Sequence, residues 1–213
     1  EPFTALGLTH AGAGGGESIA PSVLQHTGLN AVVDWVLVEL RTGTAANTAV
    51  ATRSCLILSS GEIVDKDGTG APYLMAPPGD YHIVLRHRNH LAAMTANAIT
   101  LGNSLTMIDL SDPGLPLYGT DAMRTEAGVR MLWSADVTGN NQVMYSGSGN
   151  DRDPILVRIG SVVPTAIATG YHRTDTNMDG VTRYTGGAND RDPILQNIGG
   201  VVPTNVLHGQ VPQ

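Results

Sequence analysis

The hydrophobic and polar positions of residues 30–110 alternate over short runs, as in β-strands that bury one face. The clearest run is residues 80–88, where Tyr81, Ile83, Leu85 and His87 fall on one face. Gly, Pro, Ser and Asp mark turns every 8 to 15 residues. This spacing favours a mainly β domain, an immunoglobulin- or prealbumin-like β-sandwich, over a parallel α/β sheet. The strands that we expect are residues 35–41, 48–58, 62–65, 73–75, 80–88, 98–101 and 104–110.

The first ten residues also alternate, with Phe3, Ala5 and Leu8 at the predicted core-facing positions. A run of Gly and Ala follows at residues 11–16, so we expect residues 1–29 to be a short strand on a flexible tether. This strand either joins its own sheet or adds to an exposed sheet edge of a neighbouring subunit. If the second arrangement repeats head to tail, it builds a filament. The predicted self-assembly residues are Phe3, Ala5, Leu6 and Leu8.

An internal repeat dominates the last part of the chain, residues 111–213, after a predicted linker strand at residues 129–133. Residues 136–165 and 175–204 are offset by 39 positions and are identical at 16 of 30 positions. Both copies contain Asn-Asp-Arg-Asp-Pro-Ile-Leu, in which the Asp-Pro pair predicts a helix start with Asp at the N-cap and Pro at N1. Gly160 and Gly199 lie where a short helix would end.

The later copy opens with the residues that a calcium loop requires. Side-chain oxygens occupy positions 1, 3 and 5, and Gly180 at position 6 allows a sharp turn. An EF-hand has Glu at position 12, but Gly186 stands there, so the remaining carboxylates must come from further along. The alternative is a pair of Asx-turns without an ion. The predicted ligands are Asp175, Asn177, Asp179, the carbonyl of Val181, Asp190 and Asp192.

The earlier copy matches the calcium pattern less well, because Asn141 replaces the glycine of position 6. Its corresponding ligands are Asp136, Thr138, Asn140, Gln142, Asp151 and Asp153. We therefore expect one or two bound Ca²⁺ ions. The later copy should bind more tightly, because its ligand set carries one more carboxylate.

Composition limits the partners and the cellular location that we expect for the chain. The net charge of −7 argues against a nucleic-acid partner. Cys55 is the one cysteine, so no internal disulfide can form, and we expect it to pack as a small hydrophobe. No apolar run reaches the length of about 20 residues that a transmembrane helix needs. Glu1 resembles the start of a processed or fragmentary chain, and calcium loops favour an extracellular location, where the ion is abundant.

No catalytic constellation is visible. Residues 87–90 read His-Arg-Asn-His, but in an extended chain His87 and His90 point to opposite sides, and no third ligand or paired carboxylate lies nearby in sequence. We expect these side chains to bond to loop carbonyls at one end of the sandwich. The chain has no Gly-x-Ser-x-Gly motif and no phosphate loop, so we expect that it is not an enzyme.

Several motifs resemble the C-terminal regions of large secreted proteins of Bacteroidetes bacteria. They are residues 1–7, 34–41, 51–53, 78–81 and 86–91, together with both Asn-Asp-Arg-Asp-Pro-Ile-Leu copies. The resemblance implies an exported, β-rich protein with a duplicated dockerin-like calcium module, and it implies no known activity. A looser resemblance links the chain to subunits of extracellular filaments.

Two classes of function follow from the sequence. The first is a calcium-binding structural subunit of an extracellular filament or surface layer, a homopolymer built head to tail by strand exchange. The second is a non-catalytic module for adhesion, carbohydrate binding or dockerin-like docking, with glycans or a cell-surface protein as the partner. Tyr145 and Tyr184, at equivalent repeat positions, are the best sugar-stacking candidates, although aromatic residues are only 4% of the chain.

Overall fold

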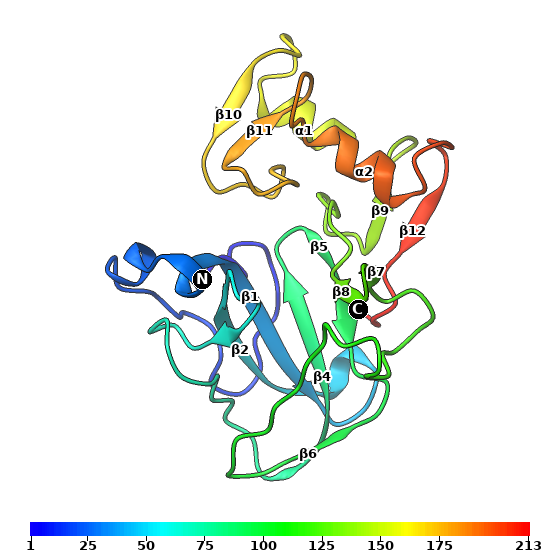
Figure 1. Cartoon of the computed structure of the whole chain (residues 1–213). Coiled ribbons are helices and arrows are strands. Elements are labelled where there is room, and N and C mark those ends of the chain that lie inside the picture. Colours follow the sequence, from blue (N-terminus) through cyan, green and yellow to red (C-terminus); the bar gives the residue numbers. More distant parts are fainter.

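The computed structural model describes all residues, 1–213, and shows a mainly β protein. Strands take up 28% of the chain and helices 11%. The largest element is an antiparallel sheet in the order β3-β2-β1-β4-β5, with β6 paired to the start of β4 (Figure 1). Its strands are β1 (Val32–Arg41), β2 (Ala49–Leu58), β3 (Ile63–Val64), β4 (Gly79–His87), β5 (His90–Met94) and β6 (Ile99–Leu101).

Both faces of this sheet are covered by loops. On one face, Leu40, Tyr81 and Ile83 pack under residues of the segments 74–76 and 99–108. On the other face, Val84 and Met94 pack against Val211 near the end of the chain. The predicted sandwich is therefore not confirmed, because irregular segments stand where a second sheet was expected. The predicted strands at 73–75 and 104–110 did not form, and β5 was not predicted.

The predicted N-terminal strand is wrong. No strand precedes β1, and residues 2–8 form a tight turn in which the Leu8 N–H donates to the Phe3 carbonyl at 3.0 Å. Phe3 is fully buried within its own chain, whereas Ala5, expected to face the core, is exposed. The turn forms because the Glu1 carboxylate accepts the N–H groups of Phe3 and Thr4, so local hydrogen bonds override the alternating pattern.

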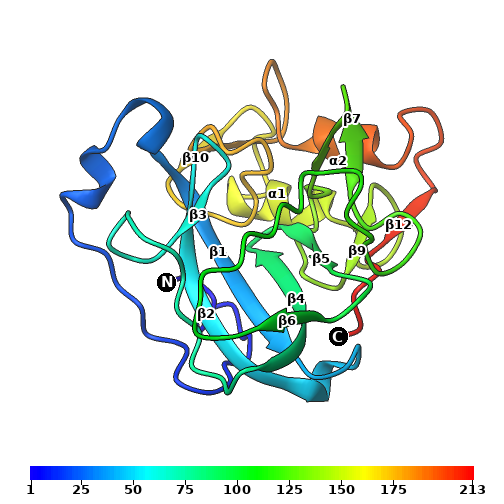
Figure 2. The same cartoon turned by 60° about the horizontal axis from the view of Figure 1, so that its bottom comes forward.

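The Gly-rich run reaches the free edge of β2 (Figure 2). The Thr52 N–H donates to the Ala11 carbonyl at 3.0 Å, and an added Cβ at Gly14 would lie 2.2 Å from the Thr52 carbonyl oxygen. Only glycine permits so close an approach between two backbones. The tether is therefore bound to the sheet edge in its own chain.

The repeats form a second lobe at one end of the sheet (Figure 1). Each copy holds a three-residue strand and a helix, another three-residue strand follows the copy directly, and all three elements recur at the offset of 39 residues. The strands pair between the copies, since β10 pairs with β11 and β12 pairs with β9 in equivalent registers. Neither copy is complete alone. The elements are β9 (Gln142–Met144), α1 (Arg152–Arg158), β10 (Ile167–Thr169), β11 (Val181–Arg183), α2 (Arg191–Asn197) and β12 (Val206–His208).

A shared core joins the two lobes. Ile155 of α1 and Ile194 of α2 are fully buried in one cluster with Leu91 of β5. A small hairpin of β7 (Arg124–Glu126) and β8 (Val129–Met131) lies in the linker between the lobes. Three 3₁₀ turns complete the chain, at Val23–Gln25, Gly28–Asn30 and Ala46–Thr48. No helix is long and apolar enough to cross a membrane.

The helix stops follow the prediction, but the predicted helix start, with Asp153 at the N-cap and Pro154 at N1, is wrong. Pro154 stands at the third helical residue of α1, not the first, because the helix begins at Arg152. The capping side chain is Asn150, whose Oδ1 accepts the Asp153 N–H at 3.0 Å. At the other end Gly160 has φ +103°, its N–H bonds to the Val157 carbonyl, and the next N–H closes a Schellman motif. The same arrangement recurs at α2, with Asn189, Asp192, Pro193 and Gly199.

The close approach of Gly14 to Thr52 allows a test of whether the N-terminal arm, residues 1–16, binds the edge of β2. We predict that Gly14→Ala lowers the free energy of unfolding by about 1–3 kcal/mol, because its Cβ cannot fit against Thr52. Gly102→Ala is the matched control, since nothing lies within 4 Å of its Cβ and its φ is not positive. Urea unfolding measures both. Equal stability of the two variants would show that the arm does not bind the β2 edge.

Candidate functional site

The candidate site consists of two loops, which we call the later loop (residues 175–190) and the earlier loop (residues 136–151). Each begins at the first aspartate of a repeat and ends just before a helix. In the later loop Asp175 and Asp190 are 2% and 0% exposed. The two oxygens of Asp175 accept the N–H groups of Asp179 and Gly180, and Asp190 accepts those of Thr176 and Arg183. The loop therefore closes around two buried carboxylates.

The earlier loop repeats this geometry. Asp136 accepts the N–H groups of residues 139, 140 and 141, and Asp151 accepts those of Thr138 and Met144. Asp136 is 6% exposed and Asp151 is fully buried. Asn141 has a positive φ of 66°, where Gly180 of the later loop has 82°, so the missing glycine does not change the turn. Both loops thus hold two buried carboxylates braced by backbone N–H groups.

The buried carboxylates repel one another in the absence of an added cation. Burial raises the pKa of Asp151 to about 6, the backbone N–H groups oppose this, and the charge of Asp136 adds to it. Burial likewise raises the pKa of Asp136 and of Asp190, and the charge of Asp175 contributes at Asp190. Such pairs are unfavourable when ionised, and a bound cation would relieve them.

The other predicted ligands are placed less favourably. Asn177 and Asp179 are exposed; each accepts an N–H two residues on, as in Asx-turns, and Asp179 also pairs with Arg183. Asp153 and Asp192 are exposed in the first turns of the helices, where each accepts an amide hydrogen from Asn150 or Asn189. In the earlier loop, the Thr138 hydroxyl donates to Asp151, and the Asn140 side chain accepts the Gln142 N–H. Gln142 is the first residue of β9, and Val181 is the first residue of β11.

These residues fit a calcium ion in charge and in ligand type, because the loops offer buried carboxylates and further oxygens. They do not form a closed cage, since no group of three or more His, Cys, Asp or Glu side chains is arranged to hold a metal. Each carboxylate oxygen that accepts one N–H retains a second lone pair that could bind an ion. The first and last aspartates of each loop are thus the core of the candidate site, and Asp153 and Asp192 lie outside it, bonded to the cap residues Asn150 and Asn189.

The turn between β4 and β5 connects the sheet to these loops. Its two residues, Arg88 and Asn89, are 3% and 0% exposed. Arg88 donates to Asp34 at 3.0 Å and to the His172 carbonyl, and its guanidinium lies 4.4 Å from the ring centroid of Tyr171. The expectation that these side chains bond to loop carbonyls is confirmed for the Arg88 guanidinium, whereas a ring nitrogen of His90 bonds to the Asn89 side chain.

The expectation for the histidines was wrong. Because the chain turns at Arg88 and Asn89, His87 and His90 face each other across the hairpin, with ring centroids 4.3 Å apart. A carboxylate is also near, since the Nε2 of His87 lies 3.0 Å from Asp34. Burial acts to raise the pKa of Asp34, but bonds and charges from His87 and Arg88 hold it at about 2. Burial, with the charges of His87 and Arg88, holds the pKa of His90 well below its usual value, so His90 is neutral.

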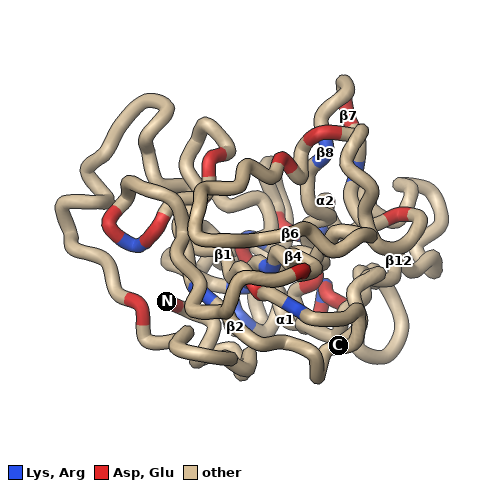
Figure 3. The backbone as a smooth tube through the Cα atoms, turned by 90° about the horizontal axis from the view of Figure 1, so that it is seen from below, with Lys and Arg blue, Asp and Glu red and all other residues tan.

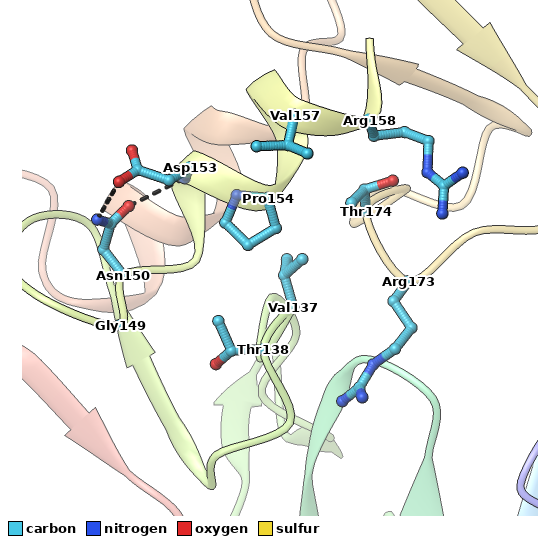
Figure 4. Close-up of a pocket in the computed structure, with 10 residues that line it drawn as sticks. All are labelled: Val137, Thr138, Gly149, Asn150, Asp153, Pro154, Val157, Arg158, Arg173 and Thr174. Carbon is cyan, nitrogen blue, oxygen red and sulfur yellow. Dashed lines mark hydrogen bonds between the residues drawn. The ribbon is translucent and has the colours of Figure 1, made fainter. Parts of the chain in front are cut away.

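An open groove lies beside the earlier loop (Figure 4). Pro154 and Val157 of α1 form one wall, Val137 lies below them, and Arg158 and Arg173 lie on the far side. The dashed lines in Figure 4 mark the cap between Asn150 and Asp153. Over the whole chain, basic and acidic residues are interspersed, without a region in which basic residues gather alone (Figure 3).

The structure also places the other predicted residues. Leu6 and Leu8 are half-buried beside the buried Phe3. Tyr145 and Tyr184 are partly buried against the shared core, beneath the guanidinium groups of Arg152 and Arg191. Cys55 is fully buried among Val36 and Leu85, and burial raises the pKa of its thiol to about 12, so it packs as a hydrophobe as predicted.

Four residues that sequence reasoning did not assign shape the site: Asn89, Asn150, Asn189 and Tyr171. The capping role of Asn150 and Asn189 could have been predicted from the sequence. They occupy equivalent positions in the two repeats, and each stands three residues before the first-turn aspartate whose N–H it accepts. Asn89 and Tyr171 carry no such signal, since their partners lie 86 and 137 positions away.

The chain matches no known protein family, and it matches no curated protein or solved structure.

The raised pKa of Asp151 predicts a pH-dependent stability. A carboxyl group whose folded pKa exceeds its unfolded value stabilises the fold at low pH, and this contribution is lost as pH rises from about 4 to about 6. In chelator, Asp151→Asn should therefore gain about 3 kcal/mol relative to wild type between pH 4 and pH 7. The difference between the two proteins cancels the opposite pH dependence of His90.

Urea unfolding of both proteins across this pH range measures the effect. Asp153→Asn is the matched control, because Asp153 is exposed and lies two residues away. Its difference from wild type should stay flat. A flat difference for Asp151→Asn as well would show that Asp151 is ionised without penalty in the folded protein.

Proposed function

We propose that this chain is an extracellular calcium-binding structural protein, a subunit that assembles with copies of itself into a filament or surface layer. The observation that carries the proposal is the burial of two carboxylates in each of two equivalent loops. The like charges within each pair destabilise the folded chain at neutral pH unless a cation neutralises them. Calcium suits these loops because it accepts many oxygen ligands in flexible geometry.

Calcium would also organise the repeat lobe. The strands of the lobe are only three residues long, and its loops are held by bonds to the aspartates. Ordering a backbone residue costs about 1–2 kcal/mol, so an ion that fixes a loop of this length contributes substantially to folding. Millimolar calcium outside the cell suffices for a weak site, which favours the extracellular location.

The N-terminal arm supplies a route to assembly. Residues 1–16, the N-terminal arm, form a turn and then bind the edge of β2 in their own chain. Residues 17–31 connect the arm to β1, and their only regular elements are two 3₁₀ turns. If this connection opens, the arm of one copy can fill the same place on the next copy, as in domain swapping. The contacts stay the same, so the exchange costs little beyond the entropy of association.

The alternative function is a non-catalytic adhesion, carbohydrate-binding or docking module of a larger secreted protein. The short helices α1 and α2 lie side by side, and each is followed by an exposed Val-Val pair, with Val162 and Val201 both 84% exposed. These side chains favour protein docking over sugar binding, because Tyr145 and Tyr184 pack within their own repeats.

Calcium titration tests the first part of the proposal. We expect heat of binding in calorimetry of chelator-treated protein, with the tighter site in the later loop. Asp190→Asn should weaken that site by about tenfold or more, since it removes a buried carboxylate. Asp192→Asn should change it little, because Asp192 is exposed and its carboxylate accepts a hydrogen bond from the cap residue Asn189. Equal losses in the two variants, or no binding by wild type, would count against the proposal.

Electron microscopy tests the second part. Wild type should form filaments or sheets in calcium that loosen in chelator. A chain lacking residues 1–16 should remain folded but should not assemble by itself, and should end the growth of wild-type assemblies, because it offers an acceptor edge without an arm. Ala5→Ser, a change at an exposed arm position, is the control and should assemble normally. Assembly by the truncated chain would rule out exchange of the arm.

A further inference from the structure

One buried residue contacts both candidate loops, one through its side chain and the other through its backbone. Asn89 lies in the turn of the β4–β5 hairpin, is 0% exposed, and belongs to neither repeat. A buried amide must find partners for its donors and its acceptor, because unpaired polar groups are costly in an interior. The hydrogen-bond partners of Asn89 therefore indicate which segments it holds in place.

The side chain of Asn89 holds the start of the later loop. Its Nδ2 donates to the carbonyl of Asp175 at 2.7 Å and to that of Arg173 at 2.9 Å. Its Oδ1 lies 2.9 Å from the Nδ1 of His90, so all of its polar side-chain atoms are paired. Arg88 also points to the Asp175 carbonyl, but at 3.5 Å, which is longer than a normal hydrogen bond. Asn89 thus carries the short link to Asp175.

The backbone of Asn89 holds the start of the earlier loop. Its carbonyl accepts the Asp136 N–H at 3.0 Å. The next bond along the same side runs from the Leu91 N–H to the Trp133 carbonyl at 2.8 Å. Asp136 and Asp175 are equivalent first residues of the two repeats. A single residue of the sheet lobe is therefore bonded to the first aspartate of each loop.

We propose that Asn89 is a positioning residue that couples the two cation loops to the sheet. It rests on the proposed function, because the ligand that orders each loop is calcium. When an ion fixes the later loop, the Asp175 carbonyl becomes a rigid acceptor, and the hairpin of β4 and β5 is held through Asn89. The earlier loop is held through the backbone of the same residue. Ordering of either loop then reaches the β-sheet.

The two links differ in a way that an experiment can use. A side-chain substitution at Asn89 removes the bonds to the later loop and leaves the backbone bond to Asp136 in place. Asn89→Ala should therefore uncouple the later loop from the sheet while the earlier loop remains coupled. A merely structural asparagine would instead lower stability everywhere without separating the two loops.

Amide hydrogen exchange with and without calcium tests this coupling. In wild type, saturating calcium should slow exchange in both repeats and also in β4 and β5, by about tenfold. In Asn89→Ala, calcium should still slow amide exchange in both repeats. In β4 and β5, calcium should slow exchange less than in wild type, because the contribution of the later loop is lost. Combining Asn89→Ala with Asp151→Asn, which weakens calcium binding by the earlier loop, should abolish the calcium effect on the sheet. Asn89→Ser, which keeps a small polar group, serves if Asn89→Ala does not fold.

Asn197→Ala is the matched control. Asn197 also joins two segments through its amide, which donates to the Ser134 carbonyl at 2.8 Å, but it contacts neither first aspartate. It should leave the calcium effect on the sheet intact. Full slowing of the sheet in both Asn89→Ala and the double variant would overturn the proposal, and so would a wild-type sheet that does not respond to calcium.

Failure of the proposed function has a separate signature. If calorimetry shows no calcium binding by wild type, the calcium proposal fails, and the positioning role of Asn89 is judged on the calcium-free protein. Separate melting of the repeats and the sheet in Asn89→Ala, against one transition in wild type and Asn197→Ala, would support that role. A single shared transition in Asn89→Ala would overturn it.

Discussion

The structure depends on four buried aspartates, for which Arg88, 3.9 Å from the Asp175 carboxylate, and Arg173, whose charge acts on Asp136, are the nearby basic groups. Asp136, Asp151, Asp175 and Asp190 close the two loops by accepting backbone N–H groups, which loops of this length could not otherwise pair. The same burial places two like charges in each loop, and the pKa values of Asp136, Asp151 and Asp190 rise accordingly. The bonds favour the ionised form, whereas burial disfavours it, and the divalent cation that we propose would resolve this conflict.

The two lobes are tied at both ends of the repeat segment. Arg88 and Asn89 bind the backbone at the start of the later loop, and Asn89 also binds the start of the earlier loop. At the end of the chain, Val211 packs against Val84, and the Arg41 guanidinium donates to the Pro212 carbonyl at 3.0 Å. The strands of the repeats pair crosswise, so neither copy can leave without breaking the other. Stiffness in the loops is therefore transmitted to the sheet.

The strongest local patterns in the sequence predicted their elements well. The run that became β4 was found because its apolar residues have period 2, and β1 and β2 were found as apolar runs between turn signals. The helix stops were found because Gly160 and Gly199 need positive φ. The first and last aspartates of each loop were found through the repeat. The N-terminal strand was mispredicted because the Glu1 carboxylate forms a local turn that no periodicity reveals.

Long-range partners explain the remaining differences. His87 and His90 meet because the chain reverses at Arg88 and Asn89, and nothing in those four residues marks a turn. Asp34 joins them from β1, more than fifty positions away, through bonds to His87 and Arg88. The role of Asn89 follows only from its partners in the repeats. Such contacts depend on how the hairpin docks against the repeats, which a single sequence does not encode in any short motif.

A crystal structure with calcium, with anomalous differences recorded to identify the ion, tests the central claim most directly. The account predicts an anomalous peak in the later loop, with oxygen atoms of Asp175 and Asp190 at about 2.3–2.6 Å from it. A later loop that holds only water at saturating calcium, with both carboxylates bonded to the backbone alone, would contradict the account.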